Sequence, residues 1–313
     1  MERFHCLLGM RMQIELLREE DVPHACGLFE HVFGHHVSPD YWRWKYHGSH
    51  LLGCVNVIAK DTEGNLIGHA GAMVLPGSAK DGQSCPVAQV CDIMVAQAVR
   101  GGLGRDGIYP ILIRTLQSAL ADKFPGIYAY GFPGERPFRL GERLGFYWRI
   151  RDIKEYRLQA ALRDHFSLWS VKSMNWNSPH INRLESLSVT LRSAPAALRN
   201  SAYLEWRYRD CPHRAYVLLG VHRAFRTVGW AVVAREGDAL RIVDACLPGR
   251  PPSALVKAIL EWAASQGFRE VVTWLETPGI QGADTGIVAT EFAVFPPLGR
   301  FRPHFQPGDI DIF

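Results

Sequence analysis

One short aromatic motif occurs twice in this chain of 313 residues. Trp44-Lys45-Tyr46 ends the first copy, and Trp206-Arg207-Tyr208 ends the second copy 162 positions later. The eight-residue segments that end in each motif also resemble each other, at 39–46 and 201–208. Length alone allows either one large domain or two of ordinary size, but a repeat at about half the chain predicts two similar domains.

The segments after the two motifs follow the same order. In each half, short runs rich in β-branched residues are separated by Gly, Asn and Asp, which predicts a meander of antiparallel strands. Each meander ends on a strand that closes with an aspartate, Asp92 or Asp244, and a loop, an amphipathic helix and another strand follow. The strand runs are residues 55–59 and 66–74 in the first half, and 216–221, 228–235 and 240–247 in the second.

The helices and last strands of the two halves complete the expected fold. Apolar residues recur at helical spacing over 108–120 and again over 255–263, where Ser253 is the expected N-cap. Strands are expected at 127–130 and 270–274. Any two mixed α/β domains share such an order, and this alternative stays open, although the matched motif favours a repeat. We therefore expect an α/β fold with a mixed, mostly antiparallel central sheet flanked by helices in each half. The expected domains are residues 1–160 and 161–313.

The composition is that of a core-forming protein, with 47% hydrophobic and 21% charged residues. A net charge of +4 is compatible with an anionic ligand but lacks the clustered basicity of a nucleic-acid-binding protein. Seven scattered cysteines without a C-x-x-C pair argue against a disulfide framework and a structural zinc site. No stretch reaches the roughly 18 apolar residues of a membrane span. We expect a cytoplasmic protein with no metal, no nucleic-acid partner and no membrane partner, and a poorly ordered start over residues 1–10.

The segment from Val90 to Gly107 carries the strongest indication of a ligand. A strand runs into a loop with four glycines and two arginines, and an amphipathic helix follows. Glycine lets the backbone approach an anion closely, and the first N–H groups of a helix point outward at the positive end of its dipole. Strand, glycine loop and helix start together predict a pyrophosphate cradle. The alternative is a flexible glycine turn that binds nothing.

Two other phosphate-binding motifs do not account for this loop. Gly102-x-Gly104-x-x-Gly107 matches the dinucleotide fingerprint of a Rossmann fold, but the strand before it follows an antiparallel meander. The next expected strand ends in Gly131-Phe132-Pro133, without the acidic residue that would bind a ribose. No G-K-[ST] follows the glycines either, which excludes a Walker loop.

The order of these motifs resembles the GNAT superfamily of N-acetyltransferases. The resemblance rests on the V-x(4)-R-G-G-x-G of residues 95–104, on Gly131-Phe132-Pro133, and on Arg143-Leu144-Gly145-Phe146. The opening residues 14–21 and 29–33 are similar to the first strand and helix of that superfamily. The likeness covers residues 12–158 well and residues 170–313 at the level of the fold. Members with two such halves are known, so the resemblance implies two tandem GNAT halves.

The resemblance implies acetyl-CoA as co-substrate and no metal. In the superfamily, the strand that matches Ile93, Met94 and Val95 pairs with the pantetheine amides, and the loop N–H groups bind the pyrophosphate. The register departs from the usual pattern, because Val99 stands where the family has Gln or Arg, so the individual donors stay open. The matching phosphate-binding positions are Arg100, Gly101, Gly102, Gly104, Arg105 and Gly107.

The second half lacks such a loop. Its equivalent is residues 247–252, where three prolines remove N–H donors that a phosphate would need. We therefore expect one CoA per chain, bound by the first half. The second half would then shape the acceptor pocket or a dimer surface, and a homodimer is compatible with this arrangement.

The catalytic residues are the least defined part of this hypothesis. Acyl transfer needs a neutral amine, a polarised thioester carbonyl and a proton for the leaving thiolate. Asp92 is the first candidate base, although a carboxylate that caps a loop or pairs with an arginine is an equal alternative. The tyrosine acid of the family falls on Gly141, so Tyr147 and Tyr130 are the candidate substitutes, each with packing as its alternative. Some members use the terminal carboxylate as base, which here would be Phe313.

We expect an acyltransferase that moves an acetyl or short acyl group from CoA to a primary amine of an unidentified small molecule. One alternative is a non-catalytic CoA-binding protein that has lost the acid at Gly141. Another is an aminoacyltransferase that takes its acyl group from tRNA, because such enzymes also have two GNAT-like halves. That alternative needs a basic groove and no CoA loop, so the glycine loop and the modest net charge argue against it.

Overall fold

The computed structural model describes residues 3–7, 10–79, 82–100, 107–162, 167–294, 301, 303 and 305–310. The chain divides into two compact units, each built from several stretches of sequence. Unit 1 comprises Met1–Gly77, Cys85–Ile150 and Thr290–Arg300, and unit 2 comprises Ser78–Ser84, Arg151–Ala289 and Phe301–Phe313.

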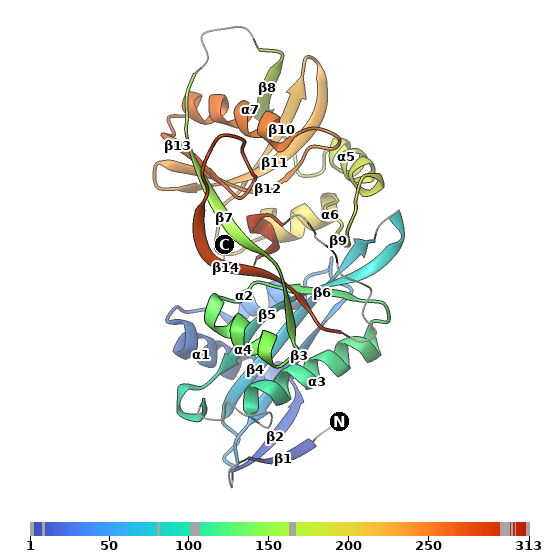
Figure 1. The fold of residues 1–313 in the computed structure, drawn as a ribbon, viewed down its shortest axis with the longest axis vertical. Helices are drawn as coiled ribbons and strands as arrows, with labels where there is room; N and C mark the ends of the chain where they lie inside the picture. Colours follow the sequence, from blue (N-terminus) through green and yellow to red (C-terminus); the bar gives the residue numbers. More distant parts are fainter. Residues whose placement is uncertain are drawn as a thin grey trace. The chain divides into compact units, whose positions relative to one another are not determined.

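Unit 1 is a sheet in the hydrogen-bonded order β1-β2-β3-β4-β5-β6-β14-β7 (Figure 1). Its strands include β1 (Arg3–Leu7), β2 (Met10–Leu16), β3 (Gly53–Lys60), β4 (Leu66–Ser78), β5 (Ser84–Val95) and β6 (Tyr128–Gly131). Its helices are α1 (Val22–Phe33), α2 (Pro39–Tyr46), α3 (Ile108–Lys123) and α4 (Glu135–Arg143), with short 3-10 turns at Glu19–Asp21 and Gln97–Val99.

Unit 2 repeats this plan, with the hydrogen-bonded order β7-β13-β12-β11-β10-β8. Its strands are β7 (Tyr147–Gln159), β8 (Trp169–Ser173), β10 (Val217–Arg223), β11 (Arg226–Glu236), β12 (Ala239–Cys246), β13 (Glu270–Thr273) and β14 (Ala283–Phe292), and β9 (Ala196–Ala197) is short. Its helices are α5 (Pro179–Thr190), α6 (Ser201–Leu204), the π-helix η4 (Glu205–Arg209), α7 (Pro252–Ser265) and the 3-10 turn η5 (Pro307–Asp309).

The last strand of each unit comes partly from the other half of the sequence. β7 begins in unit 1, and its residues from Arg151 onward belong to unit 2, where they pair with β13. β14 begins in unit 2, and its residues from Thr290 onward belong to unit 1, where they pair with β6. The division expected at residues 160 and 161 gave each half a continuous stretch, whereas the compact units exchange these strand ends.

The expected meanders are present in both units. β2, β3 and β4 pair antiparallel in unit 1, as do β10, β11 and β12 in unit 2. Each unit then adds a parallel pair, β5 with β6 and β12 with β13, which makes each sheet mixed. The prediction of a mixed, mostly antiparallel sheet with flanking helices is confirmed.

Two local expectations were wrong. Residues 3–7 form β1, paired with β2, instead of a poorly ordered extension, because β2 offers them an unpaired sheet edge. Helix α7 begins at Pro252 with Pro251 as its N-cap, so Ser253 lies inside the helix and not at the cap. A proline is tolerated in the first turn because the N–H it lacks has no partner within the helix.

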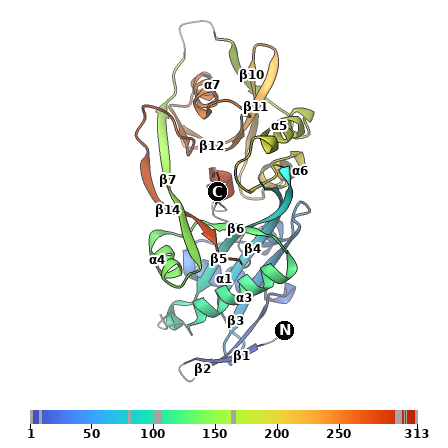
Figure 2. The ribbon, with the colours of Figure 1, turned by 45° about the vertical axis from the view of Figure 1, so that its right-hand side comes forward.

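Helix α3 is held against the sheet of unit 1 by the apolar face that its sequence predicted. The buried residues of that face are Ile108, Ile111, Leu112, Leu116 and Leu120. Both views show α3 running along the sheet (Figures 1 and 2). It comes so close to β4 at Gly68 that a Cβ there would lie 2.9 Å from a Leu112 methyl group. This packing fixes where the helix begins relative to the end of β5.

Candidate functional site

The sheet of unit 1 opens where β5 passes the end of β6. The parallel pairing runs from Val87 opposite Tyr128 to Val90 opposite Gly131, and β6 ends there while β5 continues to Val95. Residues 91–95, which we call the β5 edge, therefore lie beyond the end of β6. Backbone N–H and C=O groups on that side of the strand can pair with a ligand that carries amides. The predicted pantetheine contacts, Ile93, Met94 and Val95, all belong to this edge.

Helix α3 begins with backbone donors and no side-chain cap. Gly107 is the N-cap and makes no side-chain capping bond, and the first intrahelical bond runs from the Ile111 N–H to the Gly107 carbonyl oxygen at 3.3 Å. The N–H groups of Ile108 and Tyr109 precede that bond, while Pro110 has no N–H. Two backbone donors therefore lie at the positive end of a 16-residue helix, as an anion site requires.

The predicted phosphate loop is described only at its two ends. Arg100 donates from Nε to the Val95 carbonyl oxygen at 2.9 Å, so this arginine closes the turn that leaves the β5 edge. Gly107 is the N-cap of α3. The other four predicted positions, Gly101, Gly102, Gly104 and Arg105, lie outside the described residues, and these assignments stay predictions.

Asp92, the candidate base, sits on the β5 edge in a backbone conformation that is uncommon outside glycine. Its φ angle is 49°, in the left-handed region. One carboxylate oxygen, Oδ2, accepts hydrogen bonds from Lys45 Nζ and from the Tyr46 hydroxyl, both at 2.6 Å. The Asp92 carbonyl oxygen accepts from Nδ1 of His69 at 2.6 Å. Both the side chain and the backbone of this residue are therefore fixed by neighbours from α2 and β4.

The charges around Asp92 are buried together. The Lys45 side chain is 3% exposed and that of Asp92 is 7% exposed, so the two form a buried ion pair. Burial, with the Asp92 charge beside it, raises the pKa of Tyr46 well above its usual value, so the phenol stays protonated and donates. Burial also lowers the pKa of His69 to about 4, which keeps this imidazole neutral. A carboxylate with two donors on one oxygen can anchor the strand, and it can act as a base only through its other oxygen.

The two candidate acids, Tyr147 and Tyr130, are both buried in unit 1. Tyr147 is the first residue of β7, and its ring fills the space that a Cβ at Gly141 would need. The space beside Gly141, where the resemblance would place an acid, is thus filled by a tyrosine ring from the next strand. Burial and the neighbouring Tyr109 raise the pKa of Tyr147 well above its usual value, which keeps its proton in place. Tyr130 lies on β6, opposite Glu291 of β14.

In unit 2 a strand also continues past its parallel neighbour, and an aspartate on the extension also accepts a hydrogen bond from the motif tyrosine. The parallel pairing of β12 with β13 ends at Arg241 opposite Val272, and β12 continues to Cys246. Asp244, on that extension, accepts a hydrogen bond from the Tyr208 hydroxyl at 2.8 Å. Tyr208 ends the second aromatic motif as Tyr46 ends the first, so the repeat in the sequence corresponds to a repeated tyrosine–aspartate contact.

The start of the following helix differs between the units. In unit 2 Pro251 and Pro252 occupy the N-cap and first position of α7, so the N–H groups that Gly107 and Ile108 carry at these positions in α3 are absent. The Ala254 N–H already bonds to the Pro251 carbonyl oxygen at 3.0 Å. Among the described residues, the run of backbone donors at the start of α3 therefore has no full equivalent in unit 2.

Sequence reasoning selected Asp92 but missed the residues that hold it. Lys45 and Tyr46 were noted in the repeated motif without a contact to Asp92, and His69 was not singled out. A signal was present, because both halves pair a motif ending in a basic residue and a tyrosine with a strand that ends in aspartate. The tyrosine–aspartate contact could have been inferred from that double occurrence. The His69 contact could not, because a histidine inside a strand has no comparable pattern.

Among the residues the structure describes, no group of three or more His, Cys, Asp and Glu side chains is placed to hold a metal ion. No helix in the described part of the chain combines the length and apolar character needed to cross a bilayer.

The comparisons with known proteins concern the fold. No family model matches the chain, and no curated protein sequence matches it. Solved structures do match, and the alignments with the three described below each cover 90% of this chain. A conserved protein of unknown function from Enterococcus faecalis V583, described as a probable N-acyltransferase, has a TM-score of 0.66 at 12% identity, with 72% of that chain covered. A GCN5-related N-acetyltransferase from Anabaena variabilis has a TM-score of 0.66 at 15% identity, again with 72% covered.

A third structure agrees with these two. A GCN5-related N-acetyltransferase from Kribbella flavida matches with a TM-score of 0.61 at 14% identity, with 70% of that chain covered. At such identities the likeness concerns the backbone arrangement and not the individual site residues. It extends over both units, as the coverage of 90% requires. The chain therefore has the fold of the GCN5-related N-acetyltransferases, the superfamily that its sequence motifs indicated.

Proposed function

We propose that this protein is an acyltransferase that moves an acetyl or short acyl group from CoA to a primary amine of a small molecule. One observation carries the proposal: β5 extends five residues past β6 and is followed by a helix whose start presents backbone donors. The β5 edge suits the amides of a pantetheine chain, and the start of α3 suits a diphosphate. The acyltransferase fold of the similar structures supports the same function.

The chain's own residues suggest how the reaction would be supported. Bound acetyl-CoA would supply the thioester. The backbone N–H groups of Met94 and Val95 are the candidates for polarising its carbonyl, because they lie at the β5 edge. Tyr147 keeps its proton at neutral pH and is the better of the two candidate acids, since its ring takes the place of a side chain at Gly141. Asp92 is proposed as a base only through the oxygen that Lys45 and Tyr46 leave open.

The contacts of Asp92 are also compatible with one alternative function, the binding of CoA without catalysis. A protein that binds CoA without turnover needs the β5 edge and the start of α3, but it needs neither a base nor an acid. Because Asp92 is ion-paired with Lys45, as Asp244 is with Arg199 in unit 2, its contacts suit a structural role as well as a catalytic one.

Calorimetric titration of CoA and acetyl-CoA tests the shared part of both functions. The double variant Arg100→Ala, Arg105→Ala should weaken CoA binding by about tenfold or more, because each arginine that meets a phosphate contributes a charge-assisted bond. Arg139→Ala is the matched control, since Arg139 lies on α4 with its side chain 75% exposed and should leave CoA binding unchanged. Failure of the unmodified protein to bind CoA would overturn the proposal.

Thiol release from acetyl-CoA over a panel of primary amines then separates enzyme from sensor. An enzyme releases thiol with at least one amine, and Tyr147→Phe should lower that rate by about 100-fold while CoA affinity stays the same, as expected for the loss of a general acid. CoA binding without thiol release from any amine would favour the non-catalytic alternative.

A further inference from the structure

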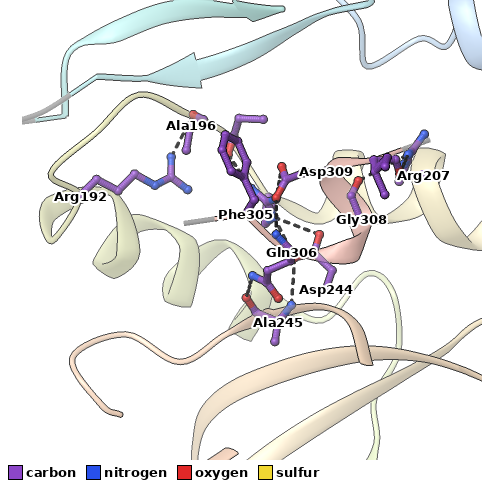
Figure 3. A network of polar contacts seen from close by, with 12 residues as sticks. Arg192, Ala196, Arg207, Asp244, Ala245, Phe305, Gln306, Gly308 and Asp309 are labelled. Atoms are coloured by element: carbon purple, nitrogen blue, oxygen red, sulfur yellow. Dashed lines mark hydrogen bonds and ion pairs between the residues drawn. The ribbon is translucent and has the colours of Figure 1, made fainter. Parts of the chain in front are cut away.

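A short segment near the C-terminus lies against the extension of β12 within unit 2. Nε2 of Gln306 donates to the carbonyl oxygen of Ala245 at 2.7 Å (Figure 3). Gly308 packs on the same strand, and a Cβ at this glycine would lie 3.1 Å from the Val243 carbonyl oxygen. Segment 305–310 therefore contacts the backbone of β12 beyond the point where β13 ends.

Buried charges hold this segment in place. Arg199 donates from Nε to Asp244 Oδ1 at 2.8 Å and from Nη2 to Asp309 Oδ1 at 2.6 Å. The three side chains are at most 7% exposed, so a single guanidinium serves two buried carboxylates. The other oxygen of Asp309 accepts from the Gln306 backbone N–H at 2.8 Å, which closes the turn of the segment on itself.

The arginine of the second aromatic motif also holds this segment. Arg207 donates from Nη2 to the carbonyl oxygen of Ile310 at 2.9 Å and to that of Gly308 at 3.4 Å. Figure 3 shows Gly308 beside Arg207. In unit 1 the basic residue at this place of the motif, Lys45, instead pairs with the aspartate of the strand. Unit 2 thus uses its motif arginine to bind backbone carbonyls of the C-terminal segment.

The place that the segment takes is equivalent to the β5 edge of unit 1. Asp92 and Asp244 mark the same point, because each follows the last parallel pair and accepts from the motif tyrosine. Ala245 follows Asp244 as Ile93 follows Asp92. Gln306 therefore donates a carboxamide N–H to a strand carbonyl at the counterpart of a predicted pantetheine contact. An amide that donates to a strand edge is the same interaction whether it belongs to a peptide or to a pantetheine chain.

We propose that the extension of β12 is a second ligand site of the same kind, specific for a peptide, and that segment 305–310 is its ligand, bound within the same chain. The equivalence to a CoA site rests on the proposed function of unit 1, whereas the peptide site itself does not. Two consequences follow. The chain binds one CoA and not two, and release of the segment exposes a site that accepts the same peptide from outside.

A displaced segment provides the decisive experiment. A Cβ at Gly308 would overlap the Tyr208 hydroxyl, so Gly308→Val expels the segment while every residue of the site stays intact. A fluorescent peptide with the sequence of residues 301–313 should then bind Gly308→Val at least about 100-fold more tightly than the unmodified protein. In the unmodified protein the segment competes at an effective concentration of roughly millimolar. The same peptide carrying the Gly308→Val change is the matched control and should bind neither protein. A folded Gly308→Val protein that does not bind the unmodified peptide would overturn the proposal.

A milder variant serves if Gly308→Val does not fold. Asp309→Asn keeps the shape of the side chain but weakens its pair with Arg199, so hydrogen exchange of residues 305–310 and 243–246 should accelerate by about tenfold or more. Exchange of residues 91–95 in unit 1 should not change. Asp238→Asn is the control, because the Asp238 side chain is 68% exposed. Unchanged exchange in segment 305–310 would contradict the proposal.

The stoichiometry of CoA separates this inference from the proposed function. One CoA per chain for the unmodified protein agrees with both. Two CoA molecules per unmodified chain would contradict the proposal that segment 305–310 blocks the site in unit 2. The function proposed for unit 1 would still stand. No CoA binding at all would remove the function proposed for unit 1, and the peptide experiment would still decide whether segment 305–310 is a ligand.

Discussion

The two units share one contact and differ in what lies beyond it. In each, the motif tyrosine donates to an aspartate on the strand that outruns its parallel neighbour, Tyr46 to Asp92 and Tyr208 to Asp244. Beyond that contact, unit 1 presents a strand edge and a helix start with backbone donors, whereas unit 2 places its own C-terminal segment there. The tyrosine–aspartate contact that supports the strand is therefore the same in both units, while the free edge of the strand has different neighbours.

The buried cations that pair with the strand aspartates also differ between the two units. Unit 1 balances one carboxylate with the single ammonium of Lys45, a compact charge. Unit 2 balances two carboxylates with the planar fork of Arg199, which can serve both at once. Burial alone would lower the pKa of Arg199, but Asp244 and Asp309 hold it well above its usual value. Burial, with Asp309 nearby, raises the pKa of Asp244.

The largest expected effect comes from removing the cation of unit 2. Arg199→Met should lower the free energy of unfolding by about 3–5 kcal/mol, because it leaves two buried carboxylates without their partner. Chemical denaturation measures this loss, and Arg209→Met is the control, since the Arg209 side chain is 45% exposed and its ion pairs contribute little. A loss below about 1 kcal/mol would mean that water reaches Asp244 and Asp309 and that the network does not hold unit 2 together.

The corresponding change in unit 1 should cost less. Lys45→Met leaves one buried carboxylate, Asp92, which keeps its bond from Tyr46, so we expect a loss of about 3 kcal/mol. The control is Arg43→Met on the same helix, whose side chain is 46% exposed. Hydrogen exchange should show faster opening of unit 1 and unchanged protection in unit 2. Equal losses for Lys45→Met and Arg199→Met would show that the second carboxylate of unit 2 adds nothing.

The plan of each unit was predictable because it rests on patterns that repeat locally. The strands at 55–59, 66–74 and 228–235 come from β-branched runs bounded by turn residues, and α3 comes from the spacing of Ile108, Leu112 and their neighbours. The exchange of strand ends by β7 and β14 was not predictable. It depends on which sheet edge a strand reaches, and no local pattern encodes that choice.

The site was predictable in the same measure. The strand that carries Asp92 and the helix start at Gly107 follow from residue types and order, and the structure has both, as β5 and the start of α3. The pair of Asp92 with Lys45 links residues 47 positions apart, and that of Arg199 with Asp309 links residues 110 apart. Such pairs depend on tertiary packing, which spacing along the chain does not reveal.

Acid should affect two buried groups, His69 of unit 1 and Asp244 of unit 2, in opposite directions. The folded pKa of His69 is about 4 against an ordinary value of 6.5, so the unfolded chain takes up a proton between these pH values and the folded unit 1 does not. The stability from His69 is therefore complete above pH 6.5 and falls by about 1.4 kcal/mol per pH unit toward pH 4. Asp244 has a raised pKa, so falling pH favours the folded form of unit 2 at that group.

Unit-resolved hydrogen exchange between pH 7 and 5 checks this difference, after correction for the intrinsic dependence of exchange on pH. Protection of β4 and β5 should fall with pH, and protection of residues 243–246 around Asp244 should fall less. His69→Gln should remove the dependence in unit 1, because the amide can still donate to the Asp92 carbonyl oxygen but does not titrate. A pH dependence that survives in His69→Gln would assign it to another group.

The smallest effect tests the shared contact itself. Tyr46→Phe and Tyr208→Phe each remove one hydroxyl that donates to a buried carboxylate, at 2.6 and 2.8 Å respectively. Each should cost about 1.5–3 kcal/mol, the range for a hydrogen bond to a charged group, with Tyr208→Phe at the lower end because Arg199 still serves Asp244. The double variant should lose the sum of the two, since the contacts have no shared partner. If one substitution were neutral and the other costly, the tyrosine–aspartate contact would support only one of the two strands, and the similarity between the units would be one of sequence without a common structural purpose.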